Sequence, residues 1–133
     1  MSELDNLQNR REQEGVRSNF PMDEGRFQQE ILRPILKAKH EQFIQFVKAY
    51  RPLKSLLCQD ISESDKREKL KKWFSVNLGF RSQMIGLVVS KFDVSQTSFY
   101  LLNKEKVDRR IMDMLLTRLI SVKDWEDNSP EIG

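Results

Sequence analysis

One histidine, His40, and one cysteine, Cys58, are the residues of this 133-residue chain best suited to metal binding or nucleophilic catalysis. A zinc site needs three or four convergent ligands, and the chain has neither a His-Glu-x-x-His nor a Glu-x-x-His motif. A reactive thiolate needs exposure and a basic setting, whereas Cys58 directly follows two leucines. We therefore expect a surface or hydrogen-bonded His40, a packing role for Cys58, no metal and no cofactor.

Serine nucleophiles and phosphate-binding loops have sequence signatures of their own, and both are absent. No serine lies in a Gly-x-Ser-x-Gly elbow, and the five glycines occur singly rather than in a loop that would surround a phosphate. The sequence therefore indicates a non-catalytic protein, with a small enzyme as the least favoured alternative.

Arg81 and Arg118 are the candidate site residues, because a helical wheel places each on an apolar stripe. A guanidinium in such a place pairs with a carboxylate, binds an anionic ligand or extends its head to water. We predict an anion-binding site at these two arginines, and a structural ion pair or a solvent-extended side chain remains the alternative.

The elements that would position these residues are helices, because apolar residues recur with a period of 3.6 from Phe27 to Val122. Pro34 and Pro52 interrupt the pattern, and Ser62 or Ser64, then Asp93 or Ser95, are placed to cap helices. No segment alternates with period two. The sequence predicts an all-α fold, a single-domain bundle of about five helices.

Charge divides the chain into three parts. Residues 1–23 read as a polar N-terminal arm, residues 24–122 as the helical bundle domain, and residues 123–133 as an acidic C-terminal tail with Trp125 as an anchor. Residues 27–122 hold 18 basic and 10 acidic side chains, which gives +8 against +3 for the whole chain. No apolar run approaches the roughly 18 residues of a membrane span, and no signal peptide opens the chain, so we expect no membrane partner and a cytoplasmic location.

The expected last helix, residues 105–121, has an unusually wide apolar face. Val107, Ile111, Met112, Leu115 and Leu116 are among the residues that spread over more than half of its circumference. A helix of this kind is either central in its own bundle or shared with a second subunit. We predict a homodimer with this helix or its neighbour at the interface.

The segments at 32–37, 80–81, 109–112 and 118–119, together with Phe92 and Asn103, resemble a family of small uncharacterised bacterial helical proteins, some of which carry the label glyoxalase. The resemblance spans about residues 27–120 and includes no motif of known chemistry, so it implies no functional residue. Glyoxalases of the βαβββ type hold a divalent metal with His and Glu on strands. One histidine and no strand pattern do not fit that activity.

The sequence therefore favours a non-catalytic helical protein–protein interaction module whose partner is itself or another protein. The alternative is a nucleic-acid or other polyanion-binding protein that uses the basic residues of the bundle domain.

Overall fold

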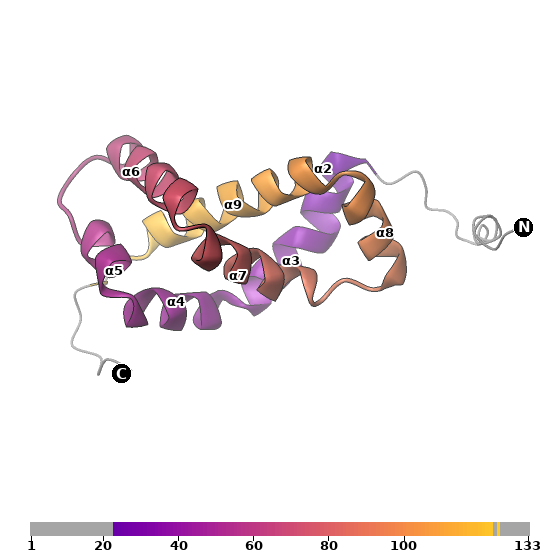
Figure 1. The fold of residues 1–133 in the computed structure, drawn as a ribbon, viewed down its shortest axis with the longest axis horizontal. Coiled ribbons are helices and arrows are strands. Elements are labelled where there is room, and N and C mark those ends of the chain that lie inside the picture. The colour runs from indigo at the N-terminus through magenta and orange to yellow at the C-terminus, as the bar shows by residue number, and fades with distance from the viewer. Residues whose placement is uncertain (1–22, 124, 126–133) are drawn as a thin grey trace, which may run out of the picture.

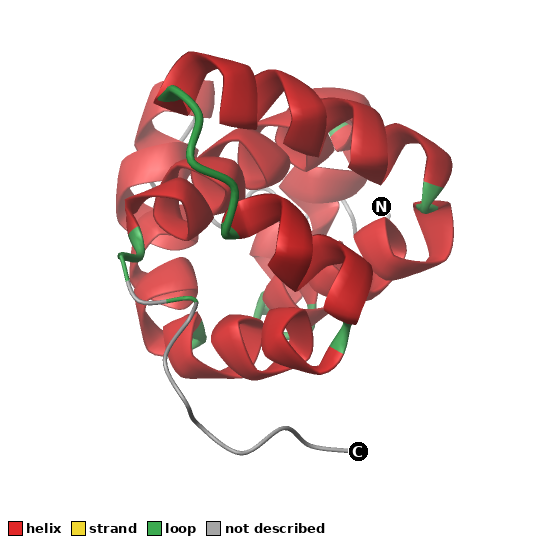
Figure 2. Ribbon diagram, turned by 90° about the vertical axis from the view of Figure 1, so that its left-hand side faces the viewer, coloured by secondary structure: helices red, strands yellow, loops and turns green. Residues whose placement is uncertain are grey.

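A computed structural model describes residues 23–123 and residue 125, and within these residues 83% are helical and none lies in a strand (Figure 2). The predicted all-α class is confirmed. The arm at 1–22 and the tail positions 124 and 126–133 lie outside the described residues. None of the described helices is long and apolar enough to cross a membrane.

The helical elements follow one another with short connections (Figure 1). In chain order they are α2 (Glu24–Arg26), the π-helix η1 (Phe27–Leu32), α3 (Arg33–Ala38), α4 (His40–Ala49), α5 (Arg51–Leu57), α6 (Glu63–Val76), α7 (Leu78–Val89), α8 (Val94–Leu102) and α9 (Lys104–Ser121).

The segments are more numerous than the five helices predicted, because the first expected helix is divided. Pro34 is near the start of α3, and the turn before it is the π-helix η1, in which the Arg33 N–H donates to the carbonyl of Gln28. Proline has no N–H to continue the α-helical ladder, and a single wider turn is how helices absorb such a break. A second break at Lys39, with φ −96° and ψ 5°, separates α3 from α4.

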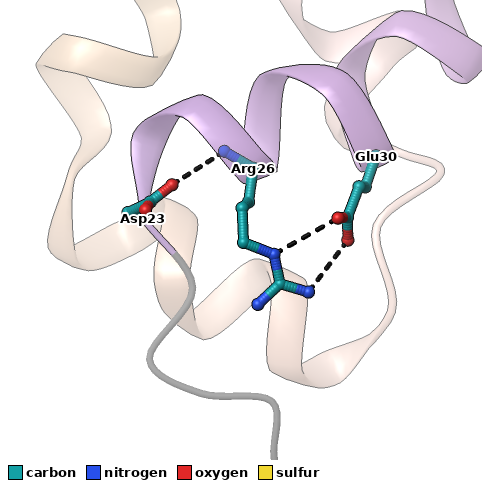
Figure 3. A network of polar contacts seen from close by, with 3 residues as sticks. All are labelled: Asp23, Arg26 and Glu30. Atoms are coloured by element: carbon teal, nitrogen blue, oxygen red, sulfur yellow. Dashed lines mark hydrogen bonds and ion pairs between the residues drawn. The ribbon is translucent and has the colours of Figure 1, made fainter.

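The N-terminal end of the bundle is held by local polar contacts (Figure 3). The Asp23 carboxylate caps α2 by accepting from the backbone N–H of Arg26 at 2.8 Å. The Arg26 guanidinium donates two hydrogen bonds to the Glu30 carboxylate, at 3.1 and 3.2 Å. These contacts define where the described chain enters its first helix.

Two later helices begin at side chains that the sequence predicted as caps. Ser62 Oγ accepts from the backbone N–H of Asp65 at 3.0 Å at the start of α6. Asp93 and Gln96 form a reciprocal capping box at the start of α8. Both satisfy backbone donors that a helix start leaves without partners.

Helix α9 is the centre of the bundle, with α3, α6, α7 and α8 packed against it (Figure 1). Its apolar side chains are buried within this one chain: Val107, Ile111, Met112, Leu115, Leu116, Leu119 and Ile120. The wide apolar face of α9 is therefore that of a helix that is central in its own bundle. It leaves no broad apolar surface on α9 for a second subunit.

Candidate functional site

Asp108 is the buried charged residue among those the structure describes, with 7% of its surface exposed. The Tyr100 hydroxyl donates to its Oδ1 at 2.7 Å, and the Lys104 ammonium donates to its Oδ2 at 2.9 Å. The three groups come together because Tyr100 lies near the end of α8, and Lys104 and Asp108 are one turn apart at the start of α9.

This cluster shifts the acid–base behaviour of its two donors. Burial, and then the hydrogen bond to Asp108, raises the pKa of the Tyr100 phenol above its ordinary value. The same carboxylate raises the pKa of Lys104. The raised pKa values favour the protonated form of both donors, and the Tyr100 hydrogen bond joins α8 to α9.

Arg118, a predicted anion-binding residue, has a protein partner. Its Nη1 lies 3.2 Å from Nδ1 of His40 at the start of α4. Because a guanidinium only donates, the imidazole nitrogen is the acceptor in this contact. Arg118 therefore joins α9 to α4, and the expectation of a hydrogen-bonded His40 is met.

Arg81, the other predicted anion-binding residue, is half-buried on α7. Within residues 23–123 and Trp125, its guanidinium has neither an ion pair nor a side-chain hydrogen bond. The structure gives Arg81 and Arg118 no common partner, so it does not join them into one site. Anion binding at either residue stays a prediction, as does polyanion binding by the bundle domain.

The hollows found among the described residues are not built for a small molecule. One cavity, of about 10 Å³, lies between the N-terminal helices and α9 and has room for about one water molecule. Another hollow, of about 380 Å³, is largely open to solvent at the surface of α5 and is lined by Arg51, Lys54, Ser55 and Cys58. A ligand pocket is a concave site that encloses most of the ligand's surface, and neither hollow does so.

The outer face of α8 is the feature that internal packing does not explain. Val94 is 84% exposed, Leu101 64% and Leu102 85%. At 100° per residue, these three side chains and the exposed Ser98 lie within a 100° arc. Helix α8 itself contains no charged residue. We call Val94, Ser95, Ser98, Leu101 and Leu102 the α8 outer face.

The sequence predicts a short helix here but does not distinguish its buried face from its exposed one. Phe99 and Tyr100 pack inwards, Phe99 stacked on Phe27 at 4.6 Å between ring centroids, and this turns Leu101 and Leu102 outwards. Residues 99–102 form a continuous apolar run, Phe-Tyr-Leu-Leu, and such a run has no periodicity from which the buried residues could be predicted. Comparison of the chain with family models, curated proteins and solved structures found no match.

Proposed function

We propose that this chain is a non-catalytic protein–protein interaction module that associates with a second copy of itself through the α8 outer face. The observation that carries the proposal is the exposure of three large apolar side chains on one uncharged helix face. Apolar side chains gathered on one exposed face are typical of interaction surfaces, whereas scattered ones are ordinary.

The chemistry of the α8 outer face favours self-association over other interactions. A charged partner would find no complementary charge in α8, and two copies of an uncharged face meet without repulsion. The α6–α7 corner, where Val76 and Leu78 are exposed, is less suited to pairing with itself. Lys72 lies one helical turn before Val76 on α6, and two copies would bring their Lys72 side chains together.

Burial of this face would stabilise a dimer. Full burial of a valine or leucine side chain contributes roughly 1.5–3 kcal/mol, and a symmetric dimer would bury Val94, Leu101 and Leu102 of each copy. A dissociation constant on the order of micromolar corresponds to about −8 kcal/mol of binding free energy.

The test is the mass in solution of the full chain, measured by light scattering over a concentration series. We expect a mass approaching twice 15.8 kDa above roughly ten micromolar. Leu101→Lys should return the protein to the monomer mass. Leu78→Lys is the matched control, because Leu78 is the same residue type with a similar exposure, 60% against 64%.

Circular dichroism of both variants checks that the helices persist. A monomer at every concentration would overturn the proposed self-association. Dissociation by Leu78→Lys and not by Leu101→Lys would place the interface at the α6–α7 corner and refute its assignment to α8.

A further inference from the structure

We infer that the two copies pair α8 against α8 in antiparallel orientation, with Ser98 of each on the two-fold axis; this rests on the proposed self-association. In a two-fold interface the same patch meets itself, so if residue i contacts residue j, then j contacts i. The residues of the α8 outer face have a spacing that satisfies this condition.

The spacing is symmetric about Ser98. Val94, Ser98 and Leu102 are four residues apart and form one row along the helix surface. When two antiparallel rows meet at Ser98, Val94 lies opposite Leu102 of the partner subunit, and Leu102 lies opposite the partner's Val94. Each contact joins a smaller apolar side chain to a larger one, and each contact occurs twice.

A small residue at the centre of this row lets the two helices approach closely. Packed helices have axes about 8–10 Å apart, and Cα atoms lie about 2.3 Å from the axis. Ser98 adds one hydroxyl between the two backbones, whereas a large side chain there would hold the flanking Val94 and Leu102 apart. Ser95, also exposed, lies on one side of this row and Leu101 on the other.

Charges beyond the two ends of α8 favour the antiparallel orientation over the parallel one. Lys91 precedes the helix and Glu105 follows it, and both are exposed. Neither is paired with a charged side chain among residues 23–123 and Trp125. An antiparallel pair brings Lys91 towards Glu105 of the partner subunit at both ends, whereas a parallel pair brings Lys91 towards the partner's Lys91.

The position of α8 in the molecule leaves room for such a pair. Helix α8 lies at one end of the long axis of the bundle, and α5 lies at the other (Figure 1). Two copies joined through α8 would extend away from each other, so the rest of each bundle does not block the contact.

The first experiment is a cysteine cross-link in the full chain. Ser98→Cys is made together with Cys58→Ser, which removes the native thiol. A disulfide needs Cα atoms about 4.4–6.8 Å apart, which two helices crossing at this residue provide. With oxidised glutathione as the oxidant, the two thiols each lose a proton and an electron and form one disulfide.

The control is Ser82→Cys with Cys58→Ser, because Ser82 is also an exposed serine in a helix, α7. Thiols held together in a dimer have an effective concentration in the millimolar range. We therefore expect Ser98→Cys to cross-link at least about tenfold faster than Ser82→Cys at tens of micromolar protein. Equal rates in a protein that light scattering shows to be dimeric would overturn this register but leave the proposed self-association standing.

The second experiment reverses the end charges and needs no cysteine variant. Lys91→Glu and Glu105→Lys should each raise the dissociation constant of the dimer roughly three- to tenfold, the range for two exposed ion pairs turned into repulsions. The double variant should restore it, because each reversed charge again meets an opposite one. Additive weakening in the double variant would overturn the antiparallel orientation. A chain that is monomeric throughout would overturn both this inference and the proposed function.

Discussion

Trp125 should contribute more to the free energy of unfolding than its position beyond the last helix suggests. It lies beyond the last helix, among the acidic residues of the expected tail, yet it is only 3% exposed and belongs to the hydrophobic core. Its indole N–H donates to the carbonyl of Leu119 at 3.1 Å. Leu119 is in the last turn of α9, and its carbonyl also accepts from the backbone N–H of Val122 at 3.3 Å.

The magnitude follows from two separable contributions. Removing a buried large aromatic side chain costs about 3–5 kcal/mol of unfolding free energy, so Trp125→Ala should lose that amount. Trp125→Phe keeps most of the apolar volume and loses the hydrogen bond, so we expect about 0.5–1.5 kcal/mol from that loss, plus part of the packing. Against a total stability of about 5–15 kcal/mol, the alanine variant is severely destabilised.

The assay is urea unfolding followed by far-UV circular dichroism, which reads the helices and does not depend on either tryptophan. Val76→Ala is the control, because Val76 is 74% exposed and its loss should change stability by no more than about 0.5 kcal/mol. A cost below about 1 kcal/mol for Trp125→Ala would show that Trp125 does not anchor the end of α9.

Three further outcomes follow from packing, backbone freedom and protonation. Phe74 is 3% exposed, so Phe74→Ala should cost about 3–5 kcal/mol of unfolding free energy in urea. Trp73 is the larger side chain but is only half-buried, so Trp73→Ala should cost less than Phe74→Ala. Gly86→Ala should stabilise the protein by about 0.5–1 kcal/mol in thermal unfolding, since no atom lies within 4 Å of the added Cβ. Tyr100→Phe should cost about 1.5–3 kcal/mol near neutral pH, the range for a hydrogen bond to a charged group. The pKa of Tyr100 is raised on folding, so the stability that this hydrogen bond gives the wild type is full below a pH of about 10 and is lost above it. The difference in unfolding free energy between the wild type and Tyr100→Phe should therefore shrink when urea titrations are made at alkaline pH. A difference that did not shrink would contradict this cause.

Local signals in the sequence predicted most of the helical architecture. Ser62 and Asp93 cap helices as expected, because a cap depends on residues three positions apart and needs no tertiary partner. The break at Lys39 carries no such signal, since neither proline nor glycine is there. The number of helices was therefore underestimated at this position.

The candidate site was less predictable, because its contacts join distant parts of the chain. Arg118 and His40 are 78 residues apart, and nothing in the periodicity of either helix indicates the other. The helical wheel correctly placed Arg118 beside apolar residues, and this is why it needed a polar partner. It could not show whether that partner was a ligand, a carboxylate or, as the structure has it, an imidazole.

Helices α8 and α9 show why a wide apolar face is weak grounds for an interface. The face of α9 is broad because four other helices pack around it, so each of its apolar residues has a partner within the chain. Helix α8 is shorter and contributes only Tyr100 to the fully buried core, so its leucines are left outside. A surface for a second chain has to be sought among the apolar residues that the fold leaves exposed, and hydrophobicity alone does not distinguish these from the core. The sequence left the last helix and its neighbour both open as the interface, and burial of the α9 face is why the proposal uses the neighbour, with Leu101 and Leu102, not Ile111 or Leu115, as the residues to change.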